Sequence, residues 1–482
     1  MERYNLVVIG AGSAGLVVAA GAAGLGARVA LVERDKMGGD CLNYGCVPSK
    51  ALLRSAKAAV QPRSTRFGVG AVTPALRWPE VAARVQAVIA TIAPHDSVER
   101  FTALGVDVLQ GQGRLTSPHS VQVQLNAGGT RTLEGKALVL ATGSGPLVPP
   151  VPGLAEAGYL TNETVFTHPE QPRRLCVLGG GPIGLELGQA FARLGSQVTV
   201  VEMLPRILPR EDADAAAVVA QALGADGLAL RTGLQAVRVE RGPAGKRVLC
   251  RPAGQADAPE EAIEVDEILV AVGRRASLEG LGLEALGVAT ERGRLKVDAR
   301  LRTSVRSIYA CGDCVGPFQF THMANQQARV VIQNALLPFK TRMDYRVVPW
   351  CTFTDPELAR VGLSEDEARE RGTPYRTITV PLAEMDRAVC DGVTEGFLKI
   401  LTPPGRDDIL GAMLVGAHAG ELLHEIVLAM QARLRLRDIA ATVHMYPTLA
   451  EIFRRAGDES RKAGFTPRIR RIFAAYLRWQ RR

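Results

Sequence analysis

The chain has 482 residues, 47% of them hydrophobic and 22% charged, which excludes a disordered or fibrous protein and leaves room for several ordinary domains. Only 5% of the residues are aromatic, and the abundance of small aliphatic residues favours an α/β protein with parallel sheets covered by helices. The net charge is +9, but residues 454–482 hold ten Arg or Lys and two acids, so the nearly neutral remainder does not favour nucleic-acid binding.

The cysteine pattern and the N-terminal stretch bear on the compartment. The eight cysteines are irregularly spaced and do not make a disulfide framework, which indicates the reducing cytoplasm. Residues 7–32 are apolar enough to imitate a signal peptide, but Glu2 precedes them and glycines interrupt them. We therefore expect no targeting segment and a cytoplasmic protein.

A βαβ unit is expected at the start of the chain, with strands at residues 5–10 and 28–33 and a helix at 13–26 between them. The first turn has GxGxxG spacing, and an acid ends the second strand. The glycines let the backbone approach a pyrophosphate, the helix N-terminus supplies N–H donors, and the acid suits a ribose hydroxyl. By itself, the glycine spacing would also fit a plain strand-to-helix turn. The predicted dinucleotide site consists of Gly10, Gly12, Ser13, Ala14, Gly15 and Glu33.

Cys41 and Cys46 follow this unit within the segment GGDCLNYGCVPSK. A regular helix separates residues five apart by about 7.5 Å of rise, more than the roughly 4.4–6.8 Å between Cα atoms that a disulfide accepts. A bridge between them therefore needs a distorted backbone, which Gly45 allows. Strained, accessible disulfides are the labile or catalytic kind. Two buried free thiols are the alternative, and the spacing alone favours it.

A second βαβ unit repeats the order of the first, with strands at residues 175–179 and 197–202 and a helix at 182–194. Two nucleotide sites are therefore expected. The second one consists of Gly179, Gly181, Gly184 and Glu202.

The acid of the second site, Glu202, predicts which nicotinamide cofactor binds there. A carboxylate at this position favours a free 2′-hydroxyl and repels a 2′-phosphate, so NADH is expected. Arg206 and Arg210 follow closely and leave NADPH as the alternative.

The last part of the chain has a different pattern. Residues 308–313 are typical of a strand that ends in a turn and returns to the first domain. Strand-like runs at 347–353, 396–401 and 409–416 then precede a helix expected at 420–435. Strands followed by a helix indicate an α+β domain.

The segment GGDCLNYGCVPSK resembles the active-site signature of the pyridine nucleotide-disulfide oxidoreductases, which include dihydrolipoamide dehydrogenase, glutathione reductase and mercuric reductase. Both glycine-rich turns and residues 142–143, 309–313 and 353–357 match in the family's order. The resemblance implies FAD in a first Rossmann-like domain, NAD(P)H in a second, and an obligate homodimer through the α+β domain. The expected parts are residues 1–150 and 281–345 for FAD, 151–280 for NAD(P), 346–465 for the dimer interface and 466–482 for a tail.

The resemblance also implies roles for single residues. Cys46 is similar to the thiol that contacts the flavin, and Cys41 to the interchange thiol that attacks the substrate. Lys50 and Glu186 match a pair in which a cation stabilises the reduced flavin and a carboxylate holds it; a plain surface salt bridge is the alternative. The further cofactor contacts that the resemblance implies are Gly39, Asp40, Lys50, Gly113, Thr142, Gly143, Ser144, Gly273, Asp313 and His322.

Cys311 and Cys314 form a CxxC pair around Asp313, which in isolation suggests zinc or a second redox pair. The sequence has no second CxxC or His pair to complete a metal site. We therefore expect buried filler residues and no bound metal.

The sequence departs from the family where dithiol-oxidising members carry a His-Pro-Thr-x-x-Glu motif, since Tyr446 occupies the position of the histidine base. A tyrosine, with an ordinary pKa near 10, is a poor proton acceptor at neutral pH. Glu451 keeps its place, and His444 either reaches into the site or bonds the loop backbone. Ordinary lipoamide turnover is therefore not favoured.

Loss of that histidine is shared with mercuric reductases, and Pro182 adds to the likeness. The vicinal cysteines that end mercuric reductases are absent beyond Cys390, and we expect no N-terminal metal-carrier domain. The sequence thus predicts a mercuric reductase-like enzyme that reduces a soft metal ion or a disulfide. The alternatives are a dihydrolipoamide dehydrogenase and a slow redox-sensing or membrane-recruited flavoprotein.

The C-terminal tail predicts a basic amphipathic helix, because Ile469, Ile472, Phe473, Tyr476 and Gln480 have helical spacing. The arginines nearby are Arg468, Arg471, Arg478 and Arg482. Such a helix packs on the dimer partner or docks on an anionic membrane surface, and the sequence leaves both open.

Overall fold

The computed structural model describes residues 2–63, 65, 67–242, 245–464 and 467–481. Contacts within the chain divide it into two units. The larger unit comprises Met1–Ser64, Gly70–Met203 and Gly233–Asp344, and the smaller unit comprises Thr65–Val69, Leu204–Thr232 and Tyr345–Arg482. The finer boundaries expected at residues 150, 280 and 345 stay predictions.

The first layer of the larger unit is a mixed sheet. The buried strand β1 (Glu2–Ile9) pairs in parallel with β2 (Val29–Glu33) on one side and β5 (Thr130–Leu140) on the other. β17 (Ile308–Ala310) pairs in parallel with β5, although the two are far apart in sequence. β3 (Val106–Ser117), β4 (Ser120–Leu125) and β5 form an antiparallel meander.

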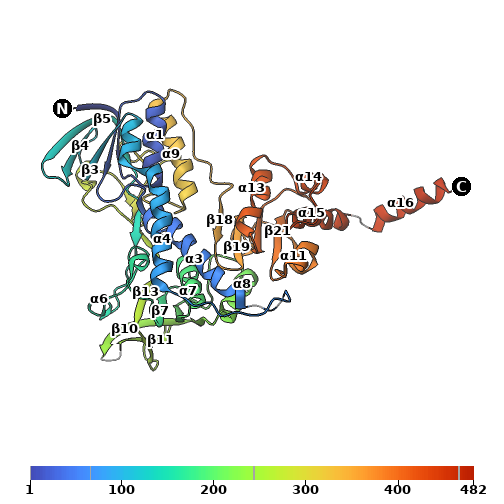
Figure 1. Ribbon diagram of the computed structural model, residues 1–482. Coiled ribbons are helices and arrows are strands. Elements are labelled where there is room, and N and C mark those ends of the chain that lie inside the picture. Colours follow the sequence, from blue (N-terminus) through green and yellow to red (C-terminus); the bar gives the residue numbers. More distant parts are fainter. Residues whose placement is uncertain (1, 64, 66, 243–244, 465–466, 482) are drawn as a thin grey trace. The chain divides into compact units, whose positions relative to one another are not determined.

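Two helices cover one face of this sheet, α1 (Ser13–Gly24) and α9 (Thr321–Leu336) (Figure 1). They pack against each other, and alanines and valines from both form one core cluster with β1. Small side chains suit this close approach of helix and sheet. As a result, α9 begins beside the segment that follows β1.

The second βαβ unit lies in the same larger unit. β7 (Arg174–Leu178) pairs in parallel with β8 (Gln197–Glu202) and with β13 (Glu267–Val270), and α7 (Pro182–Arg193) joins β7 to β8. The two βαβ units expected from the sequence are confirmed within three residues of their predicted ends. The other elements of this unit are α2 (Gly39–Asn43), α3 (Cys46–Val60), α4 (Trp78–Ile92), α5 (Val98–Ala103), α6 (Leu154–Ala157), β6 (Ser144–Pro146), β10 (Leu234–Gly242), β11 (Gly245–Pro252), β12 (Glu261–Val265), β14 (Arg274–Ala276), β15 (Thr290–Glu291) and β16 (Arg294–Leu295).

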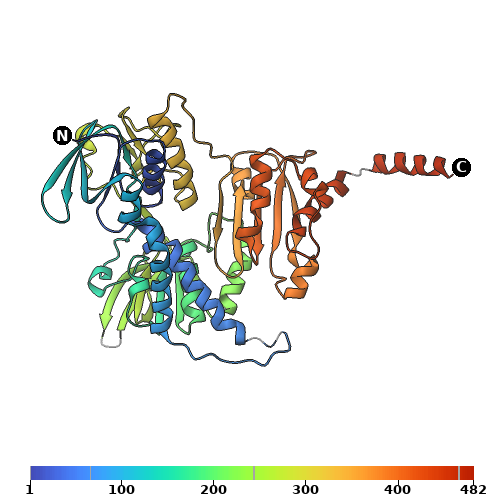
Figure 2. The same ribbon diagram turned by 45° about the horizontal axis from the view of Figure 1, so that its top comes forward.

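The smaller unit is built on an antiparallel sheet in the order β18-β19-β22-β21-β20, whose strands (orange) lie side by side in Figure 2. This confirms the α+β domain. Its strands are β18 (Pro349–Thr352), β19 (Glu357–Gly362), β20 (Arg376–Pro381), β21 (Phe397–Thr402) and β22 (Gly411–Gly416). Its other elements are α8 (Ala213–Ala225), β9 (Ala229–Thr232), α10 (Glu365–Glu370), α11 (Asp386–Asp391), α12 (Ala419–Leu422), α13 (His424–Gln431), α14 (Leu436–Ala441), α15 (Glu451–Gly464) and α16 (Pro467–Gln480).

Ion pairs hold the segment Leu204–Thr232 in the smaller unit. The buried Lys399 ammonium on β21 lies 3.2 Å from Asp212 and 2.6 Å from Asp214. A buried charge needs such partners, because burial removes its hydration.

The helix expected at residues 420–435 is wrong in detail. It is split into α12 and α13 at Leu423, and α13 ends at Gln431. Arg433 has a φ of 56°, a left-handed conformation that an α-helix cannot continue through.

The expected tail helix is confirmed as α16. Among the residues that the structure describes, no helix combines the length and the apolar character that crossing a bilayer requires.

Candidate redox and nucleotide sites

The two cysteines of the predicted redox pair lie on different helices. α2 ends at Asn43 and α3 begins at Cys46, so the regular helical rise is interrupted between Cys41 and Cys46. Gly45 lies at the break in a confined place, because a Cβ atom there would lie 2.8 Å from the Asp40 carboxylate and 3.2 Å from the Asp40 carbonyl oxygen. The distortion that the sequence predicted between the cysteines is therefore present.

The environment of Cys46 favours a thiolate. Cys46 is the first residue of α3, and its Sγ lies 3.4 Å from Oγ1 of Thr321, the first residue of α9. Each helix N-terminus stabilises a nearby negative charge by roughly 0.3–1 kcal/mol. Thr321 was not among the predicted residues, since only the packing of α9 against the first domain brings it there.

The two thiols titrate very differently. A hydrogen bond from Cys41 is the main reason that the pKa of Cys46 falls to about 6, and the Thr321 hydroxyl and the Lys50 charge act in the same direction against burial. The same hydrogen bond and burial raise the pKa of Cys41 above its ordinary value. The pair therefore holds one proton on Cys41 and a negative charge on Cys46 at neutral pH.

We expect the reduced enzyme to be alkylated by iodoacetamide with a rate that rises through a midpoint near pH 6, because the thiolate of Cys46 is the reactive form. Above this pH the rate levels off until Cys41 ionises. Mass spectrometry of the quenched reaction gives the rate at each pH. In all samples the exposed Cys390 is replaced by serine to remove its signal. A single midpoint above pH 8 would contradict the assignment of the thiolate to Cys46.

Lys50 and Glu186 are brought together as expected. Lys50 on α3 donates a hydrogen bond of 2.7 Å from Nζ to Glu186 Oε2 on α7. Glu186 is buried and Lys50 is partly exposed, one turn after Cys46 on the same helix. A buried carboxylate is tolerated when it is paired, and here the pair fixes a cation near the redox thiols.

The first glycine-rich turn has the shape of a dinucleotide cradle. A Cβ atom on Gly15 would lie 1.8 Å from the Gly10 carbonyl oxygen, so strand and helix meet too closely for any other residue. Gly12 has only one atom within 4 Å of such a Cβ, which leaves the loop open for a ligand. Glu33 accepts a hydrogen bond of 2.6 Å from the Ala11 amide and ends β2 at the edge of the cradle. These residues fit the adenosine half of FAD.

The second turn repeats this geometry for the nicotinamide cofactor. A Cβ on Gly184 would lie 2.1 Å from the Gly179 carbonyl oxygen, whereas one on Gly181 would meet nothing within 4 Å. Glu202 accepts a hydrogen bond of 2.7 Å from the Gly180 amide, as Glu33 does in the first turn. The same arrangement therefore occurs twice in the larger unit.

A largely buried arginine that the sequence did not predict connects two predicted FAD ligands. Arg274 Nη2 lies 3.1 Å from Asp40 Oδ1, and its Nε lies 3.7 Å from Asp313 Oδ2. Ser144 donates a hydrogen bond of 2.7 Å to Asp313, whose pKa is raised by burial. The sequence held one clue to this role, because Arg274 directly follows Gly273, which was predicted to contact the cofactor.

The remaining predicted FAD contacts lie in strained or tightly packed positions. Gly143 and Gly273 have φ values of 67° and 145°, which favour glycine. A Cβ on Gly113 would lie 3.3 Å from Ile9. His322 stacks on Phe320, with ring centroids 5.3 Å apart. Their contacts with a cofactor stay predictions, as does that of Thr142.

Cys311 and Cys314 are completely buried. Cys314 donates a hydrogen bond to the Leu140 carbonyl, and burial raises its pKa to about 11. Among the described residues, no group of three or more His, Cys, Asp or Glu could hold a metal ion. Their burial suits filler residues, and this role stays a prediction.

The residues of the altered base motif lie in the smaller unit. Tyr446 donates a hydrogen bond of 2.9 Å to Asp386 on α11, and this bond raises the pKa of the phenol. His444 is buried, with Nδ1 at 3.0 Å from the Thr442 carbonyl and Nε2 at 2.9 Å from Glu425. Glu451 begins α15 and pairs with Arg454. Both nitrogens of His444 are thus engaged, one by the loop backbone and one by Glu425 of α13, and Tyr446 keeps its proton.

Comparison with known proteins relates most of the chain to one family of redox enzymes with such nucleotide-binding turns. The model of a family described as pyridine nucleotide-disulphide oxidoreductase matches residues 4–328, and the dimerisation domain of the same family matches residues 348–456. A dihydrolipoyl dehydrogenase of Thermus scotoductus is 38% identical over 94% of this chain and 96% of its own length. A mercuric reductase of Staphylococcus aureus is 34% identical over 93% and 81%. The Cu(II) complex of the HOCl-induced flavoprotein disulfide reductase RclA from Escherichia coli has a TM-score of 0.84, with 30% identity over 95% of this chain and 99% of its own.

Proposed function

Because the chain belongs to the pyridine nucleotide-disulphide oxidoreductase family, we propose that it is a mercuric reductase-like enzyme that reduces a soft metal ion or a disulfide at Cys41 and Cys46. It is a flavoprotein oxidoreductase that uses FAD and NAD(P)H. Its dimerisation domain supports a homodimer. The substrate, the preference for NADH and the cytoplasmic location are the parts that we propose.

Bound FAD supplies a relay that accepts a hydride from the nicotinamide and delivers two electrons to the disulfide. Gly10, Gly12 and Glu33 would hold its adenosine half and Asp313 its ribityl chain, while Lys50 would supply a positive charge that stabilises the reduced flavin. Glu186 keeps Lys50 in position through their hydrogen bond. The roles of these residues are to bind, orient and neutralise charge.

After the disulfide is reduced, the two thiols share one proton. Cys46 carries the negative charge, and Cys41 holds the proton because its pKa is raised. To attack a disulfide, Cys41 passes its proton to Cys46 through their hydrogen bond and reacts as the thiolate, which displaces one substrate thiolate. That thiolate takes the proton from Cys46, and Cys46 then attacks the mixed disulfide, re-forms the Cys41–Cys46 bond and releases the second thiolate. A soft metal ion instead binds the pair as thiolates and displaces the proton to water.

The observation that carries the choice of substrate is the hydrogen bond from Tyr446 to Asp386. The carboxylate raises the pKa of the tyrosine, so this residue is unable to accept a proton at neutral pH. Oxidation of a dithiol needs a base to remove its proton, whereas reduction of a metal ion bound as a thiolate complex does not. Tyr446 is therefore more compatible with reduction of a metal ion than with oxidation of a dithiol.

The substrate panel that tests the proposal compares mercuric ion, cupric ion, glutathione disulfide and lipoamide, each with NADH and with NADPH. We expect at least one metal ion to be reduced with a kcat/KM about tenfold or more above that for lipoamide. NADH should be preferred, because Glu202 disfavours a 2′-phosphate. Lipoamide turnover above all others would contradict the proposal. Slow turnover of every substrate would instead favour a redox sensor.

Dihydrolipoamide dehydrogenase is the second candidate. A relative with the printed name dihydrolipoyl dehydrogenase is 38% identical to this chain, and Glu202 suits the NAD that such a reaction would reduce. The position of Tyr446 argues against it and makes that residue the place to test it.

A further inference from the structure

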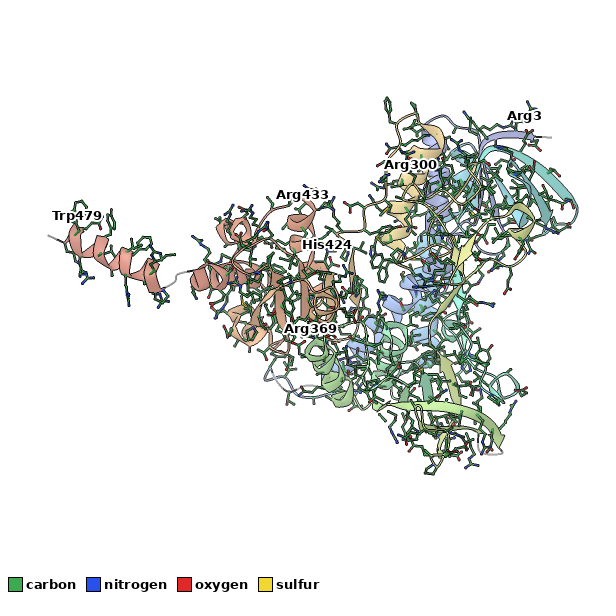
Figure 3. All side chains as sticks on the ribbon, turned by 180° about the vertical axis from the view of Figure 1, so that it is seen from behind. Arg3, Arg300, Arg369, His424, Arg433 and Trp479 are labelled. Carbon is green, nitrogen blue, oxygen red and sulfur yellow. The ribbon has the colours of Figure 1, made fainter. Side chains whose placement is uncertain are left out.

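The C-terminal helix α16 divides into two faces of opposite character. In a helix of about 3.6 residues per turn, Ile472, Tyr476 and Trp479 follow i, i+4, i+7 spacing and lie on one face. All three side chains are at least half exposed, and Figure 3 shows Trp479 projecting from α16. Ile469, Phe473 and Leu477 fall on the same side by their spacing. This apolar face spans the length of the helix.

On the opposite face of α16, every charged side chain is an arginine. Arg471 and Arg478 are seven residues apart and share a face, whereas Arg470 is turned about 100° from Arg471 and lies beside Leu477 at the border of the apolar face. Arg468 lies at the border of the apolar face, and Arg481 follows the helix on the basic side. Residues 467–482 contain no acid, so this positive charge is not compensated within the segment.

The composition of the apolar face favours a lipid surface over a protein core as the partner that covers it. Three of the fourteen residues of α16 are aromatic, against 5% in the whole chain. Tyr476 and Trp479 lie 6.1 Å apart between ring centroids, and each has an apolar body with a polar tip. Such side chains prefer the headgroup level of a bilayer, and arginines beside them reach anionic lipids. The matched dimerisation domain ends at residue 456, before this helix begins.

We propose that α16 is an interfacial helix that docks the enzyme on an anionic lipid bilayer, with its aromatic face in the headgroup layer and its arginines on lipid phosphates. Two copies in a dimer bind together, which raises the apparent affinity without any new contact. The inference concerns a surface outside the redox site and does not depend on which substrate is reduced.

The test is sedimentation of the FAD-loaded full-length protein with vesicles of phosphatidylglycerol and phosphatidylcholine, and with vesicles of phosphatidylcholine alone. We expect a partition coefficient about tenfold or more higher on the anionic vesicles, lowered again by ~0.5 M NaCl because salt screens exposed charges. Removal of residues 467–482 should abolish it. Arg470→Gln/Arg471→Gln/Arg478→Gln and Ile472→Ser/Trp479→Ser should each lower it about tenfold, since both faces are needed.

The matched control is Arg241→Gln/Arg306→Gln/Arg371→Gln, which removes the same charge from exposed sites elsewhere and should leave the partition unchanged. Flavin absorbance and NADH oxidation of each variant verify that the protein is folded. Equal binding of the wild type and the deletion variant would overturn the proposal. A second contrary result is that the wild type does not bind vesicles and the deletion variant dissociates into monomers in sedimentation velocity. The helix α16 would then pack on the dimer partner. Retention on heparin without vesicle binding would also overturn the proposal, in favour of a soluble polyanion.

Discussion

Replacing Cys46 by serine is expected to lower turnover of any disulfide or metal substrate by about a thousandfold or more, because a single thiol cannot form the intramolecular disulfide on which the relay depends. Cys41→Ser should have an effect of the same size, since the two residues act as one unit. The loss is measured as kcat/KM with the preferred substrate of the panel. Ferricyanide takes electrons from flavins directly, so its reduction by NADH should change less than threefold.

A control variant and the ferricyanide reaction show whether this result is specific to the redox pair. Cys390→Ser is the matched control, because Cys390 is an exposed thiol on α11 in the smaller unit. It should retain wild-type turnover. Retained substrate reduction in Cys46→Ser would show that the pair is not on the electron path. Parallel loss of the ferricyanide reaction would instead indicate damage to the cofactor sites.

Replacing Tyr446 by histidine is expected to raise NAD-dependent dihydrolipoamide oxidation by about tenfold to a hundredfold. A positioned general base contributes about a hundredfold or more, and imidazole titrates near neutral pH, whereas the Tyr446 phenol keeps its proton beside Asp386. The measurement is the initial rate of NADH formation between pH 6 and 9. The gain should appear as pH rises through the histidine pKa, because only the neutral ring accepts a proton.

The control is Tyr446→Phe, which removes the hydroxyl and its bond to Asp386 but keeps the ring. It should leave dihydrolipoamide oxidation at its low starting value and change metal-ion reduction only slightly. A high rate in the wild type that histidine does not increase would make dihydrolipoamide dehydrogenase the better assignment. Because Tyr446 is exposed on a loop, neither substitution is expected to lower the free energy of unfolding appreciably.

The local features of this protein were predictable because they depend on neighbouring residues. Hydrophobic runs and glycine spacing located both βαβ units, since buried strands and tight turns have patterns within about ten residues. Helix geometry required a break near Gly45 only if Cys41 and Cys46 form a bridge, and the resemblance to the family supplied that condition. The helix at residues 420–435 was less accurate, because the left-handed Arg433 has no signal in its sequence.

The sequence by itself thus determined the two glycine-rich turns and the basic tail helix, and its resemblance to the family predicted the redox pair and the altered base motif. Only the tertiary structure decided what surrounds them. Lys50 meets Glu186 across 136 positions because α3 packs against α7, and Cys46 meets Thr321 across 275 because α3 and α9 begin close together in the larger unit. Arg274 joins Asp40 to Asp313 in the same way. Local periodicity sets which face of a helix is buried, but the partner of that face depends on how distant elements pack.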